Sequence, residues 1–428
     1  MKLWQKNIPI DQKIDAFTVG NDREMDLILA PYDCEASIAH ANMLAYIGLL
    51  KQEEADQLVS QLTDIQKTAV DGLFTIEPEF EDMHSKIEFL LVEKLGDLGK
   101  KIHTARSRND QVLVAMQLYL KEAFTTIEDQ VQSLFDLLLS LAEKHKDNLM
   151  PGYTHMQVAM PSSFGLWFSA YAEGLIDDRI LLQAAYKICD QNPLGSAAGF
   201  GSSFPIDRDK TTADLNFASV KYNVIAAQMG RGKIERVSAT ALSAVAATLS
   251  KMAMDICLYM GQDYQFISFP DSLTTGSSIM PHKKNPDVFE LIRGKCNLLQ
   301  ALPASISQLT TNLPSGYHRD LQLTKAPILN AIEELKNCLE LFQYSLQQIE
   351  VKADLVKSEK YDTLFTVDTL NEWVKSGMPF RTAYQKMGEQ VADGSYQANR
   401  ELKHTHLGSI GNLAITEIRK KMRLLDQG

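Results

Sequence analysis

Four short polar stretches contain the residue types that bind anions and move protons. The first, GSSIMPHKKNPD at 276–287, sets two adjacent serines beside a histidine, two lysines and an asparagine, and its prolines disfavour a continuous helix. The others are HTARSRNDQ at 103–111, MPGYTHMQVAMP at 150–161 and LPSGYHRDLQLTK at 313–325. Arg, Lys, Asn and Thr side chains bind carboxylates, and Ser and His exchange protons. Together the four stretches predict a cleft for a small substrate with several negative charges.

Each stretch taken alone also has a simpler interpretation. RSRND has the composition of a helix N-terminus, with Asn109 and Asp110 as capping residues, and the GYTH and LPSGYHRD segments are typical of turns. The glycine-rich LGSAAGFGSS at 194–203 lacks the GK[ST] ending of a phosphate-binding loop, so we expect a structural loop. The histidines form no metal-ligand motif. We therefore expect no metal, and interpret His40, His84 and His103 as surface or capping residues.

Long helices must position these stretches. From 111 to 145 there is no Gly or Pro, and apolar residues recur every three or four positions, which is the spacing of a coiled-coil seam. Further helices are expected over 162–190, 234–262, 286–308 and 327–353, with Pro286 in the first turn of its helix. The pattern predicts an all-α or mainly α protein built on a bundle of about five long helices.

The helical pattern also suggests domains and an assembly. We expect an N-terminal helical domain at 1–105, the central bundle at 106–353 and a small C-terminal helical domain at 354–428. The helix at 234–262 is apolar on more than one side, which predicts burial on all sides and hence a homo-oligomer. Lys251 and Asp255 make a membrane span the poorer interpretation of this segment.

Composition excludes some classes of function. The chain has 428 residues and a net charge of −11, which disfavours general binding to nucleic acid. Five cysteines without a CxxC pair predict buried thiols in a reducing compartment. The N-terminal residues contain no apolar core of signal-peptide length, so we expect a cytoplasmic protein.

The four stretches resemble motifs of a known family. The segment at 276–287 resembles GSSxMPxKxNP, the signature of the fumarase/aspartase superfamily, and the other three, in this order, resemble the argininosuccinate lyase family. The resemblance extends from about 21 to GMPFRTAY at 377–384. It implies a three-domain homotetramer with a twenty-helix core and active sites shared among three subunits. The implied reaction, without a cofactor, is the reversible β-elimination of argininosuccinate to L-arginine and fumarate, the last step of arginine biosynthesis.

The resemblance also implies roles for individual residues. Ser277 would be the base that removes the proton next to a carboxylate, while Lys283 and Asn285 stabilise the resulting carbanion. His155, with Glu290 as its carboxylate partner, would supply a proton or hold charge nearby. The group that finally protonates the leaving nitrogen stays open. The implied substrate-binding residues are Thr18, Ser107, Arg108, Asn109, Thr154, Asn285, Tyr317, Gln322 and Lys325.

The sequence departs from the family pattern at several positions. His282 replaces a frequent Gln, Thr18 replaces Ser, and Gly230 in QMGRGKIER falls where the family has an acidic residue, although Glu235 and Arg236 remain. The segment LWQKN replaces a WGGRF-like opening, and the C-terminal domain is short. The alternatives are another superfamily lyase, such as adenylosuccinate lyase, or an inactive crystallin-like homologue. The presence of all the implied catalytic residues favours an active enzyme.

Overall fold

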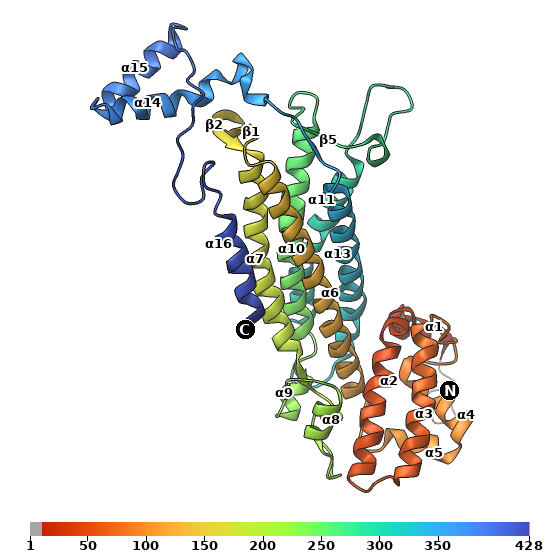
Figure 1. The fold of residues 1–428 in the computed structure, drawn as a ribbon. Coiled ribbons are helices and arrows are strands. Elements are labelled where there is room, and N and C mark those ends of the chain that lie inside the picture. Colours follow the sequence, from red (N-terminus) through yellow and green to blue (C-terminus); the bar gives the residue numbers. More distant parts are fainter. Residues whose placement is uncertain (1–10, 428) are drawn as a thin grey trace. The chain divides into compact units, whose positions relative to one another are not determined.

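The computed structural model describes residues 11–427 and shows a mainly α chain, as predicted (Figure 1). The described chain divides into two compact units. Unit 1 contains the described residues up to Glu128, together with Leu181–Ala244 and Leu298–Leu335; unit 2 contains Asp129–Ile180, Val245–Asn297 and the described residues from Lys336 onward. The domain boundaries predicted at 105 and 353 stay a prediction. The departing segment LWQKN lies outside the described residues.

The predicted long helices are present, with two corrections. They are α6 (Arg108–Lys144), α7 (Phe164–Cys189), α10 (Lys233–Met260) and α13 (Lys325–Leu346). The helix predicted at 286–308 is instead α11 (Asp287–Leu299) and α12 (Leu302–Thr310), because Pro303 lacks an N–H and occupies the start of a new helix. Pro286, which we expected in the first turn of this helix, directly precedes α11. The last helix ends at Leu346 instead of continuing to 353.

The described chain contains further helices, of which α2 is the longest. In unit 1, α2 and α3 pack through fully buried leucines such as Leu29, Leu58 and Leu62. The helices are α1 (Gln12–Val19), α2 (Asp22–Tyr46), α3 (Gln52–Val70), α4 (Met83–Leu95), α5 (Asp97–Lys100), α8 (Arg208–Asp214), α9 (Val224–Gln228), α14 (Thr366–Lys375), α15 (Phe380–Ala392) and α16 (Ile415–Leu424). The 3₁₀ helices are η1 (Lys101–His103), η2 (Asp271–Leu273), η3 (Arg319–Thr324), η4 (Leu355–Lys357), η5 (Glu359–Phe365) and η6 (Leu425–Gln427).

Three two-stranded sheets accompany the helices. In unit 2, β1 (Leu149–Thr154) and β2 (Gln157–Ser163) form an antiparallel hairpin, where the sequence predicted only a turn. Its two central residues, His155 and Met156, have φ of 51° and 60°, as a tight two-residue hairpin turn requires. The other sheets pair β3 (Gln191–Asn192) with β4 (Ser219–Val220) in parallel, and β5 (Ile267–Ser268) with β6 (Glu350–Val351) in antiparallel orientation.

Asp110 fixes both the start of α6 and the glycine-rich loop in unit 1. Its Oδ1 accepts a hydrogen bond from the backbone N–H of Ser107 at 2.9 Å, as the third helical residue does in a capping box. Its Oδ2 accepts bonds from the N–H groups of Gly195 and Ala197 at 3.0 and 2.9 Å. These contacts support the structural interpretation of the loop at 194–203.

Among the described residues, α10 is the one helix that is long and apolar enough to cross a membrane by length and composition. Half of its most apolar window is buried within the chain. Trp167 and Tyr171 of α7 both hydrogen-bond Asp255 of this helix, at 3.0 and 2.7 Å. A core helix that packs in this way passes the same test of length and composition.

The interpretation of His40 and His84 as surface or capping residues is wrong. Their exposed fractions are 1% and 7%, and His40 Nε2 lies 2.8 Å from the carbonyl oxygen of Thr104. Burial, with a smaller effect from Arg106, lowers the pKa of His40 to about 3. The ring is therefore neutral at ordinary pH. The side chain of His103, by contrast, is 40% exposed.

This buried imidazole predicts a loss of stability in acid. An unfolded histidine protonates near pH 6.5, whereas folded His40 does not until about pH 3, so its contribution is complete above about 6.5 and falls as the pH is lowered. We expect a loss of about 2 kcal/mol between about pH 6.5 and 5 from this group. His40→Gln, which keeps a donor for Thr104, should flatten this part of the curve in urea unfolding. His406→Gln, an exposed control, should not. Equal slopes for His40→Gln and the parent would contradict the assignment.

Candidate active site

The polar stretches at 103–111 and 313–325 meet at a cavity in unit 1. Its volume is about 250 Å³, and the start of α2, residues 81–84, the start of α6 and the segment 317–325 line it. Arg108, Asn109, Tyr317, Gln322 and Lys325 all contribute to its wall. Five of the predicted substrate-binding residues are therefore brought together, although up to 217 residues separate them in the sequence (325 minus 108).

Lys325 is held by carboxylates of α2 at the base of this cavity. Only 3% of the residue is exposed, and its Nζ lies 2.6 Å from Asp26 Oδ1 and 2.8 Å from Asp22 Oδ1. The other oxygen of Asp26 accepts a bond from the N–H of Met83 at 3.0 Å. Burial alone would lower the pKa of Lys325, but the two carboxylates outweigh it and raise the pKa. The ammonium group is therefore charged and fixed in position.

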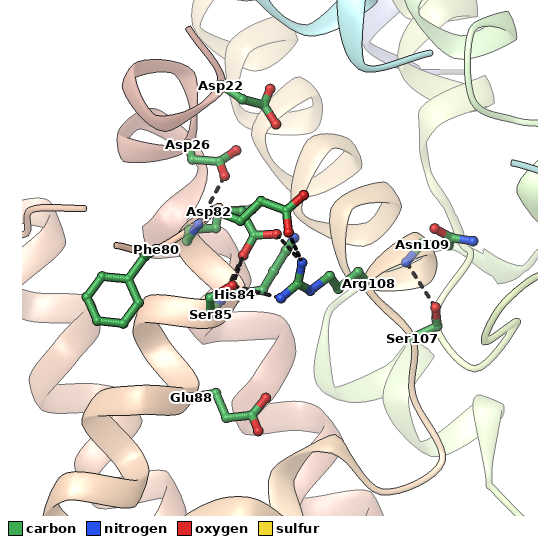
Figure 2. Close-up of polar contacts among 12 residues, drawn as sticks. Asp22, Asp26, Phe80, Asp82, His84, Ser85, Glu88, Ser107, Arg108 and Asn109 are labelled. Atoms are coloured by element: carbon green, nitrogen blue, oxygen red, sulfur yellow. Dashed lines mark hydrogen bonds and ion pairs between the residues drawn. The ribbon is translucent and has the colours of Figure 1, made fainter. Parts of the chain in front are cut away.

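Arg108 is held in a similar way by the segment before α4 (Figure 2). Its Nη1 lies 3.0 Å from both Glu81 Oε2 and Asp82 Oδ2, and its Nη2 donates to Ser85 Oγ at 2.8 Å. Asp82 also caps α4 by accepting from the N–H of Ser85 at 2.8 Å. Burial raises the pKa of Asp82, but His84 and Arg108 together lower it below the ordinary value. The arginine thus meets a full set of partners before any substrate arrives.

The fourth stretch closes the cavity through contacts with the end of α1. Arg319 donates to the carbonyl oxygen of Thr18 at 2.9 Å and pairs with Glu81 at 3.1 Å. Gln322 Nε2 donates to the same carbonyl oxygen at 3.0 Å. The hydroxyl of Thr18 donates to Ile14 at 2.9 Å within α1, so its role as a substrate contact stays a prediction. Ser107 also stays a prediction; its Oγ accepts the N–H of Asn109 at 3.3 Å.

The charges that line the cavity are balanced. Four basic side chains face four carboxylates, and most are already paired with one another. Motif reasoning found two of the basic residues and missed every one of the carboxylates. The spacing of Asp22 and Asp26, four residues apart on one helix face, was an available signal. The missed residues are Asp22, Asp26, Glu81, Asp82, Arg231 and Arg319.

The backbone around Gly230, where this chain departs from the family pattern, leaves little room for a side chain. A Cβ at this position would come within 2.8 Å of the carbonyl oxygen of Ala227, closer than real Cβ atoms approach. The backbone turn before α10 therefore favours glycine here over an acidic side chain. The next residue, Arg231, lines the cavity, and its Nε lies 3.4 Å from Glu235 Oε1. Glu235, the acidic residue that this segment retains, thus orients Arg231.

The predicted proton-transfer residues lie in unit 2. Ser277 Oγ accepts a bond from the N–H of Met280 at 3.2 Å, inside the loop between η2 and α11. The base of this loop is closed by two backbone bonds between Thr275 and Asn285, of 2.8 and 3.3 Å. Lys283 is exposed, and no carboxylate among residues 11–427 is seen to pair with it. The loop therefore presents a hydroxyl and an uncommitted ammonium group.

Thr154 and His155 occupy a different element of unit 2, the tip of the β1–β2 hairpin. Glu290, the predicted carboxylate partner of His155, lies on α11 and forms an ion pair with Arg293 at 3.7 Å. Within the described part of the chain, no hydrogen bond or ion pair joins His155 to Glu290 or to Ser277. The catalytic grouping of these residues stays a prediction.

Comparisons with known proteins define the class. Residues 5–300 match the model of a lyase family. Among solved structures, the fold is similar to that of an EDDS lyase in complex with formate, with a TM-score of 0.79. That likeness covers 98% of this chain and 91% of the other, at 22% sequence identity, and so concerns the fold alone. The chain has the mainly α lyase fold.

Two relatives with assigned names refine this class. An argininosuccinate lyase from Parabacteroides distasonis is 53% identical over 422 residues, covering 99% of this chain and 95% of the relative. An argininosuccinate lyase from Phocaeicola vulgatus is 52% identical over 427 residues, covering 100% and 96%. The chain belongs to the argininosuccinate lyase family.

The buried Lys325–Asp26 pair predicts a measurable coupling. Lys325→Met should lower the free energy of unfolding by about 3–5 kcal/mol, because it leaves a buried carboxylate without its cation. Adding Asp26→Asn should recover a large part of that loss, which a double-mutant cycle of unfolding free energies would measure. Lys357→Met, which breaks the exposed pair with Asp354, is the control and should change stability by less than about 1 kcal/mol. Additive effects of the two site variants would contradict the coupling.

Proposed function

We propose that the protein cleaves argininosuccinate reversibly to L-arginine and fumarate, as the last step of arginine biosynthesis. The observation that carries this proposal is the identity of more than half of all residues to argininosuccinate lyases over almost the whole of both chains. The cavity in unit 1 supports it, because its balanced charges suit a substrate with carboxylates and cationic groups. A different superfamily lyase, or an inactive homologue, is not favoured by these relatives.

In the proposed reaction, Ser277 removes the proton from the carbon next to a carboxylate. A neutral serine is too weak a base, so its alkoxide must be stabilised by hydrogen bonds and positive charge. The N–H of Met280 already donates to Ser277 Oγ, and Lys283 in the same loop is free to add charge. These contacts support the serine as a base when substrate excludes water from the loop.

The next steps place and then remove negative charge. Deprotonation leaves a carbanion whose charge spreads onto the adjacent carboxylate, which Lys283 and Asn285 would stabilise. The electron pair then expels the guanidino nitrogen as the C–N bond breaks and the double bond of fumarate forms. His155, supported by Glu290, would supply a proton to that nitrogen or hold charge beside it. The other predicted residues would orient the substrate before this chemistry.

We further propose a cytoplasmic homotetramer whose active sites combine residues from different copies of the chain. Exposed apolar side chains on α11 and α13 support association; Leu291, Leu341 and Tyr344 are 62%, 51% and 56% exposed. An interface between copies would remove these side chains from water. Five free cysteines, four of them buried, support a reducing compartment.

Adjacent serines allow a matched test of the base. Ser277→Ala should lower fumarate release from argininosuccinate, followed by absorbance, by about 10²–10⁴-fold while substrate binding is largely retained. Ser278→Ala changes the same loop by the same atom and should keep most activity. Adenylosuccinate is the control substrate. Normal turnover by Ser277→Ala would remove this residue from the base role, and no fumarate from the parent would end the proposed function.

Mixed oligomers test whether sites are shared. Ser277→Ala and Asn109→Ala should each be inactive alone, but co-assembled chains should regain part of the activity, because some sites then receive intact residues from both variants. Fumarate release by the purified mixture measures this. Ser277→Ala mixed with Lys283→Ala, both changed in one loop, should regain none. Absence of recovery in the first mixture would show that each site is complete within one copy.

A further inference from the structure

A second cavity lies in unit 2, among residues to which the proposed reaction gives no role. Its volume is about 480 Å³, and α14, the segment 399–406 and Met160 of β2 line it. The wall is rich in charged and amide groups, including Asp368, Lys403 and His404. A cavity of this size can hold a ligand of metabolite dimensions.

A histidine–carboxylate pair at this cavity leaves one acceptor unused. His404 Nε2 lies 2.6 Å from Asp368 Oδ1, and the side chains are only 20% and 15% exposed. Asp368 Oδ2 is buried, and no residue of the described chain hydrogen-bonds it. A buried carboxylate oxygen normally has a partner, because its desolvation costs free energy. The unused oxygen calls for a donor from a ligand.

The other charges specify the ligand further. The wall carries three carboxylates, two ammonium groups and two histidines. Lys375 is committed to Glu372 at 2.9 Å. Lys403 lies 3.9 Å from Glu401, beyond hydrogen-bond distance, and can bind an anionic group. The cavity therefore combines an acceptor for a cation with a donor for a carboxylate.

We propose that this cavity binds a free basic amino acid, with its cationic side chain on Asp368 Oδ2 and its carboxylate on Lys403. If the proposed function holds, on which this choice of ligand rests, the product L-arginine is such a molecule. Met160 connects the cavity to β2, whose Gln157 pairs with Thr154 at the hairpin tip beside His155. Occupancy of the cavity thus acts on the strand pair that carries His155, so product lowers turnover from a second site.

Equilibrium dialysis of the full-length oligomer with labelled L-arginine tests the site. We expect two arginines per chain, one at the active site and one here. Asp368→Asn and Lys403→Ala should each weaken the second by about tenfold or more and leave the first unchanged. Asp354→Asn changes an exposed carboxylate elsewhere in unit 2 and is the matched control. It should leave arginine binding at both sites unchanged. L-citrulline, whose side chain is neutral where that of L-arginine is cationic, should not occupy the second site.

Kinetics provide a second readout that is independent of the number of sites. In the parent, L-arginine should lower kcat as well as raise KM, whereas in Lys403→Ala it should only raise KM. Without arginine, both variants should keep kcat/KM within about twofold of the parent, because neither residue is in the proposed catalytic set. A single arginine site that survives Asp368→Asn and Lys403→Ala would overturn the proposal even if fumarate is released. Arginine binding that depends on Asp368, without fumarate release, would instead overturn the proposed function and still support the second arginine site.

Discussion

The buried ion pair between Lys325 and Asp26 organises the candidate substrate cavity. It joins α13 to α2 across 299 residues of sequence, and the second oxygen of Asp26 holds the N–H of Met83 at the start of α4. Three helices therefore meet at one carboxylate. Because an unpaired charge at this depth would cost several kcal/mol, alternative packings that separate these helices are strongly disfavoured. The position of the polar stretch at 313–325 next to α2 follows from this constraint.

The same pairing determines how the cavity can recognise a substrate. Its cations are not free charges waiting for an anion, since Arg108 and Lys325 each contact two carboxylates. The net electrostatic attraction of the cavity for an anionic substrate is therefore small. The orientation of its donors matters more for recognition than its total charge. Donors that are already fixed need no reorganisation when the substrate binds, which favours selectivity for one arrangement of groups. The loop at Ser277 differs, because Lys283 there is exposed and uncommitted.

Sequence reasoning succeeded where the determining interactions were local and failed where they were tertiary. Helical periodicity predicted α6, α7 and α10 closely, and the family resemblance predicted five residues that line the cavity wall. The β1–β2 hairpin was missed because Pro151 and Pro161, which face each other in the register, disrupt any strand-like pattern. Burial of His84 depends on Asp33, 51 residues away, at 3.0 Å, and such a contact leaves no mark in local composition.

The hairpin tip supports a functional role for His155 on conformational grounds. Both tip residues lie in the left-handed region, where an ordinary side chain costs about 1–2 kcal/mol and where Asn or Gly is the usual solution. Backbone stability would therefore favour another residue at this position. The paired strands impose this turn, and the exposed His155 stands at its tip. A side chain kept against conformational preference on a rigid element is what proton transfer to a positioned substrate requires.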